Sequence, residues 1–133
     1  MNSRTVTAVL DAPKDRVFDY LSEVENLPKW ANEFARELKF EHGIAKVVNG
    51  LGEFWFSIDA DEQTGVIDMY AGPGREALAL FPTRVVELAE NRSAFTFTMF
   101  QGAEMPDELF ESQYASLLRE FDNIRREFGS TAC

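Results

Sequence analysis

An amphipathic pattern near the carboxyl end is the strongest constraint on the fold. Apolar residues recur there three or four positions apart, the spacing of one helix face. They are Phe110, Tyr114, Leu117, Leu118, Phe121, Ile124 and Phe128. Pro106 is typical of a helix start and Gly129 of a helix end. The pattern predicts one helix of about 23 residues, roughly 35 Å long, and another layer must cover its apolar stripe.

The centre of the chain shows the two-residue alternation of β-strands. Turn signals such as Asn49-Gly50 and Gly72-Pro73-Gly74 divide it into segments. The predicted strands are 5–10, 36–48, 51–61, 66–71, 77–89 and 93–101. Hairpin connections make neighbouring strands antiparallel. The predicted fold class is α+β, with a six-stranded curved antiparallel sheet wrapped around the long C-terminal helix and two short helices between strands 1 and 2.

The short helices are separated by a break at ENLPKW. Leu27 precedes Pro28, and a following proline disfavours helical backbone. The first helix is therefore expected to end by about Asn26, and a new turn to begin at Pro28. This arrangement gathers Leu27, Trp30 and Phe34 at one corner.

Charge and composition exclude several partners. Thirteen Lys and Arg against 23 Asp and Glu give a formal net charge of -10, and the basic residues are scattered. Phosphate backbones bind clustered positive charge, so neither nucleic acid nor an anionic membrane is an expected partner. No window reaches the ~18 apolar residues of a membrane span, so no membrane insertion is expected. A cytoplasmic location is predicted.

The single cysteine, Cys133, provides neither a disulfide framework nor a metal motif. We therefore expect no metal and no cofactor. The length of 133 residues is that of one domain.

Four segments carry a family resemblance: TVTAVLDAPKDRVFDYLSEVENLPKWANEF at 5–34, RVVEL at 84–88, FTFTMFQG at 95–102 and MPDELFESQYASLLREFDNI at 105–124. With the order of elements, they resemble the START-like (Bet v 1-like) helix-grip superfamily, or SRPBCC, and within it the polyketide cyclase/dehydrase-like branch. The resemblance implies a single START-like domain over 1–133, with an apolar ligand cavity between the helix and the sheet. It implies no particular reaction, because one fold hosts many functions.

Our first hypothesis is binding of a small hydrophobic molecule, which is aromatic, lipid or polyketide-like. Twelve Phe, three Tyr and two Trp exceed what a compact aliphatic core needs. The predicted ligand-binding residues are Trp30, Phe34, Phe40, Phe54, Phe56, Met69, Phe97, Met99, Tyr114, Leu117 and Phe121. The same residues also suit plain core packing, with Trp30 closing one end of the core.

The alternative is a cyclase, dehydratase or isomerase that acts on a ketone-bearing substrate in the same cavity. His42, the only histidine, would be the general base, and Arg84 or Tyr114 would stabilise the enolate oxygen. Each also has a structural interpretation: His42 would lie near a strand end, and Arg84 on the outer face of the sheet. No Ser-His-Asp order or paired Cys and His points to covalent hydrolysis or a metal. A homodimer and a protein-binding adaptor with an outer sheet surface are further hypotheses.

Overall fold

The computed structural model describes residues 1–130, so Cys133 lies outside the described residues. Within this range the strands are β1 (Ser3–Leu10), β2 (Glu37–Glu41), β3 (Ile44–Asn49), β4 (Gly52–Asp61), β5 (Val66–Gly72), β6 (Ala79–Ala89) and β7 (Arg92–Phe100). The helices are α1 (Lys14–Leu21), the short 3-10 helix η1 (Val24–Asn26), α2 (Leu27–Trp30) and α3 (Asp107–Phe128). No helix in residues 1–130 is long and apolar enough to cross a bilayer.

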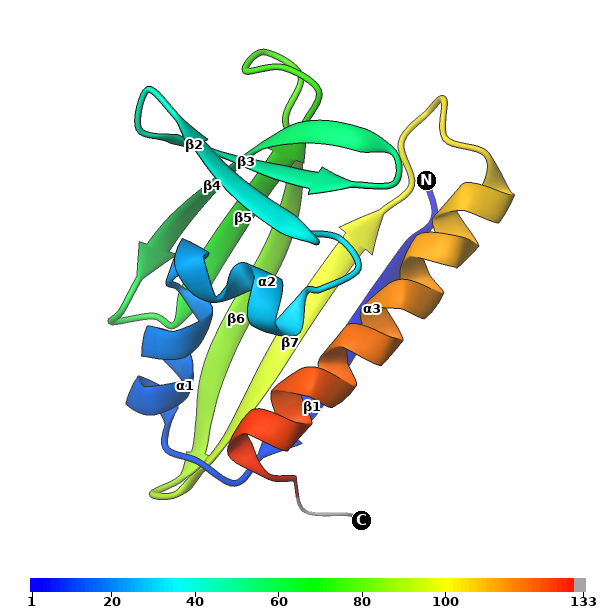
Figure 1. The fold of residues 1–133 in the computed structure, drawn as a ribbon. Helices are drawn as coiled ribbons and strands as arrows, with labels where there is room; N and C mark the ends of the chain where they lie inside the picture. Colours follow the sequence, from blue (N-terminus) through cyan, green and yellow to red (C-terminus); the bar gives the residue numbers. More distant parts are fainter. Residues whose placement is uncertain (131–133) are drawn as a thin grey trace.

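One antiparallel sheet contains the seven strands in the order β1-β7-β6-β5-β4-β3-β2. Strands β2 to β7 form a meander, and β1 pairs with β7. Val6 lies opposite Phe97, and Ala8 lies opposite Phe95. Directly opposed residues point to the same face, so these four side chains share the inner face. Figure 1 shows the sheet curving around α3, which places this face on the concave side.

The prediction of six strands is wrong by one, because 36–48 is not a single strand. The chain turns back at His42 and Gly43, which separate β2 from β3. Both residues have positive φ, 53° and 79°, as a two-residue type I′ hairpin turn requires. The alternation of Leu38, Phe40 and His42 runs into the turn without a break, so spacing alone did not indicate it.

Helix α3 confirms the predicted layers. It begins after Pro106 and ends at Gly129, which has a φ of 81°. Its apolar stripe is buried against the concave face, and the Phe121 ring stacks on Phe95 of β7 with the ring centroids 5.4 Å apart. Figure 1 shows α3 running along β1 and β7. The sheet and the helix therefore cover each other's apolar surfaces.

The segment between β1 and β2 forms the predicted corner but differs in its backbone. Leu27 has helical angles, φ -54° and ψ -47°, so the expected non-helical conformation is wrong. Leu27 starts α2, and Pro28 follows in the first turn, where its missing N–H breaks no helical hydrogen bond. Leu27 and Trp30 are buried and Phe34 is half-buried, so the three residues do meet at one corner.

Candidate functional site

A cavity of about 460 Å³ lies between α3, the segment from α2 to β2 and the concave face of the sheet. This volume is in the range of small-molecule sites, roughly 300–1,000 Å³. The strands present inward-facing apolar side chains to it. Met69 of β5 lies directly opposite Phe81 of β6, and both line the cavity together with Phe56 of β4 and Phe97 of β7. Strand alternation therefore builds a largely aromatic wall.

Trp30 closes a second side of the cavity. Its side chain is buried, and its ring meets Phe95 and Phe97 edge-on, with centroids 6.2 and 6.4 Å away. The ring also lines the cavity. Trp30 therefore covers the core on one side and the open space on the other, which explains an indole ring at a helix corner.

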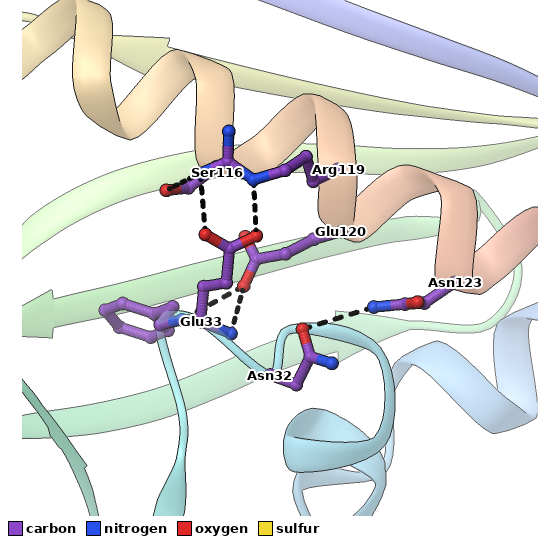
Figure 2. A network of polar contacts seen from close by, with 7 residues as sticks. Asn32, Glu33, Ser116, Arg119, Glu120 and Asn123 are labelled. Atoms are coloured by element: carbon purple, nitrogen blue, oxygen red, sulfur yellow. Dashed lines mark hydrogen bonds and ion pairs between the residues drawn. The ribbon is translucent and has the colours of Figure 1, made fainter.

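Polar contacts hold the segment after α2 against α3 (Figure 2). The Arg119 guanidinium donates two hydrogen bonds to the Glu33 carboxylate, at 2.9 and 2.7 Å. The Asn123 amide donates to the Trp30 carbonyl at 2.9 Å. The hydrogen bond from Arg119 holds the pKa of Glu33 below its usual range. This pair is therefore charged at neutral pH, and it fixes the wall that contains Trp30.

Glu120 is the ionisable residue that reaches the cavity from a buried position on α3. It is only 4% exposed, and it lines the cavity. Its Oε2 accepts hydrogen bonds from the backbone N–H groups of Glu33 and Phe34, at 3.1 and 3.0 Å. Burial penalises the charged form and raises the pKa of Glu120 to about 7, although both N–H bonds act in the opposite direction. Glu120 therefore exists in both protonation states near neutral pH.

Most of the predicted ligand-binding residues do line the cavity. They are Trp30, Phe34, Phe56, Met69, Phe97, Met99 and Leu117. Phe56 comes from β4, Met69 from β5, and Phe97 and Met99 alternate along β7, whereas Leu117 comes from the apolar stripe of α3. Contact of these residues with a ligand stays a prediction.

Four predicted residues lie outside the cavity wall. Phe40 is 54% exposed, because β2 is an edge strand that ends one residue later. Phe54 is half-buried and packs on the core. Phe121 is fully buried among the rings of β7. The ring of Tyr114 lies under the Arg4 guanidinium, 5.6 Å from ring centroid to guanidinium carbon.

Neither predicted catalytic side chain lines the cavity. His42 is exposed in the hairpin turn. Arg84 is exposed, and its Nε donates to the Thr64 carbonyl at 3.1 Å, whereas the neighbouring Val85 is fully buried on the inner face. The structure therefore does not bring the predicted base and the predicted cation to the cavity.

Glu120 and Phe81 also line the cavity and were not predicted from the sequence. Glu120 lies three residues after Leu117 and four before Ile124, so a carboxylate within the apolar stripe was the available signal. Phe81 lies in the run Leu78 to Pro82, where every residue is apolar. Such a run contains no alternation, so it did not indicate which side chain faces inward.

Among residues 1–130, no group of three or more His, Cys, Asp or Glu side chains is placed to hold a metal ion.

Comparisons with known proteins establish the fold. No protein-family sequence model and no curated protein sequence matches the chain. Solved structures do match. An uncharacterized protein from Bacillus thuringiensis superposes with a TM-score of 0.74 at 13% identity, over 96% of this chain and 98% of that one. The Zhui aromatase/cyclase from Streptomyces sp. R1128 has a TM-score of 0.66 at 18% identity, over 96% of each chain.

A START superfamily protein from Mycobacterium smegmatis also has a TM-score of 0.66, at 12% identity, over 95% of this chain and 96% of that one. Identities this low show the fold alone. The chain has the helix-grip fold, as the resemblance implied.

Proposed function

We propose that this helix-grip protein binds a small hydrophobic molecule in the cavity between the sheet and α3. The observation that carries this proposal is the space of about 460 Å³ beside a tightly packed core. Phe95 and Phe121 stack directly on each other, whereas Phe56 and Met69 face open space. Apolar area removed from water drives binding at ~25 cal/mol per Å², less the cost of ordering the ligand.

Two solved structures of similar fold are consistent with this proposal. An aromatase/cyclase and a START superfamily protein share this architecture. Their sequences are too distant to transfer a substrate, so the proposal for this chain is limited to an apolar body that fits the cavity. A cytoplasmic location and a homodimer belong to the same proposal.

Titration with the fluorescent apolar probe N-phenylnaphthylamine tests the proposal. We expect saturable binding by the native protein and at least about tenfold weaker binding by Leu117→Trp, which places a larger side chain in the cavity wall. Leu118→Trp is the matched control, because Leu118 is 41% exposed on the same helix and does not line the cavity. Equal binding by the two variants, or no binding by the native protein, would refute the proposal.

A second candidate, an isomerase, dehydratase or cyclase, is favoured by Glu120 alone. A general acid or base works best with a pKa near the operating pH, and the pKa of Glu120 is about 7. Glu120 would take the role that we had assigned to His42. This candidate predicts that the native protein accelerates deuterium exchange beside the carbonyl of a bound aromatic ketone, and that Glu120→Gln does not. Equal exchange rates with both proteins would exclude Glu120 as the base.

A further inference from the structure

The two oxygens of Glu120 have different environments. Oε2 accepts both backbone N–H groups, from Glu33 and Phe34. Oε1 has no hydrogen-bond partner among the described residues. Every solvent-inaccessible side-chain oxygen or nitrogen in the buried and half-buried residues of 1–130 has a hydrogen-bond partner. Oε1 has none, so it must be accessible to solvent. Glu120 lines the cavity and its side chain is otherwise buried, so the accessible oxygen lies where Glu120 meets the cavity wall. The Glu33 carboxylate lies close by (Figure 2), and its charge also raises the pKa of Glu120.

The surroundings of Oε1 suit a positive charge. Trp30, Phe34, Phe56, Phe81 and Phe97 supply five aromatic rings to the wall. The faces of aromatic rings attract cations, and the attraction grows when water is excluded. A cation that enters this space therefore meets a carboxyl oxygen and several rings at once.

For an anion, the same wall offers one cationic side chain among the described residues, Arg36. Glu33, Arg36 and Glu120 are the charged residues that line the cavity within residues 1–130. Glu33 is already paired with Arg119, and Arg36 is exposed. The formal net charge of -10 further favours cations over anions.

We propose that the cavity selects a hydrophobic amine, whose protonated nitrogen pairs with Oε1 of Glu120 while its apolar body fills the aromatic space. This inference rests on the proposed binding function and specifies its ligand class. A carboxylic acid of the same shape would bring a second negative group beside Glu120, and a neutral alcohol would form only an uncharged or half-charged hydrogen bond.

Amine binding also has a proton signature. A cation beside a carboxyl group favours its ionised form. Near pH 7 a substantial fraction of Glu120 is protonated, because its pKa is about 7. Binding of an ammonium group therefore releases a fraction of a proton from Glu120, whereas binding of the alcohol does not.

Isothermal titration calorimetry of the full chain near pH 7 tests the inference with three probes: naphthylmethylamine, naphthylmethanol and naphthylacetate, substituted at the same ring position. We expect the amine to bind about ten- to a hundredfold more tightly than the alcohol, the advantage of a hydrogen bond to a charged partner, and the acid to bind most weakly. The amine enthalpy should change between phosphate and HEPES buffers, which reports the released proton.

The variant Glu120→Gln should lose the preference for the amine and keep the affinity for the alcohol. Glu108→Gln is the matched control, since it removes an exposed carboxylate of α3 outside the cavity wall and changes the net charge equally. It should retain the preference.

Two results would overturn the inference in different ways. If the alcohol binds and the amine binds no more tightly, the amine inference fails and the proposed binding function stands. If none of the probes binds, both fail. Should Glu120→Gln not fold, as judged by circular dichroism, the amine-to-alcohol ratio and the buffer dependence of the native protein still decide the outcome.

Discussion

Replacing Glu120 by glutamine should stabilise the protein at alkaline pH and leave its stability nearly unchanged at acid pH. A glutamate in an unfolded chain titrates near 4.3, whereas burial raises the pKa of Glu120 in the folded protein to about 7. Between these values the folded state binds more protons than the unfolded state, so the free energy of unfolding falls as the pH rises. The contribution of protonated Glu120 to the free energy of unfolding is fully present below about pH 4 and is lost above about pH 7.

The magnitude follows from the two pKa values. Their difference of about 2.7 units, at about 1.36 kcal/mol per pKa unit, corresponds to roughly 3–4 kcal/mol. The amide oxygen of glutamine still accepts the N–H groups of Glu33 and Phe34, but glutamine does not ionise. The advantage of Glu120→Gln over the native protein should therefore grow from near zero at about pH 4 to about 3–4 kcal/mol at about pH 8.

Urea unfolding followed by far-ultraviolet circular dichroism measures this difference at each pH. With a slope of about 1–3 kcal/mol per molar urea, the midpoints should separate by about 1 M or more at high pH. Glu33 and Arg119, the charged neighbours of Glu120, are present in both proteins, so their own titration largely cancels. Glu108→Gln should follow the native profile. Parallel pH profiles for Glu120→Gln and the native protein would refute the argument from burial.

Two further substitutions test the core and the corrected site. Phe121→Ala should lower the free energy of unfolding by about 3–5 kcal/mol, because its fully buried ring packs on Phe95 and Phe97; a loss below about 1 kcal/mol in urea unfolding would contradict this packing. His42→Gly should raise the stability by up to about 1 kcal/mol, because glycine relieves the left-handed backbone at φ 53°. The same variant should bind N-phenylnaphthylamine as tightly as the native protein does. Weakened binding would indicate that His42 does contribute to the ligand-binding site.

The layers of the fold were predictable because periodicity is a local property. Phe121 and Ile124 lie on one face of any α-helix, and Phe95 and Phe97 lie on one face of any strand. The turn at His42 was not predictable in the same way. Histidine enters the left-handed region less readily than glycine, so Gly43 alone marked the turn, and the alternation of apolar residues before it continued up to His42.

The inward face of the site was also predictable, but its outline was not. Phe54 and Phe56 both alternate along β4, yet Phe56 borders open space and Phe54 packs on the core. Which inward side chain borders the cavity depends on the curvature of the sheet and on where α3 crosses it. For Glu120 the sequence shows the position within the apolar stripe. It does not show the two N–H partners, which come from a segment 86 and 87 residues away.

The choice of glutamate at position 120 needs an explanation beyond the fold. The backbone N–H groups of Glu33 and Phe34 require an acceptor, and a glutamine oxygen would serve them without ionising. At neutral pH glutamate is the less stable choice, because part of the population carries a buried charge. The buried negative charge is compensated when a cationic apolar molecule enters the cavity. If Glu120→Gln bound the amine probe as tightly as the native protein does, Glu120 would serve only to accept the two backbone N–H groups and would have no role in binding.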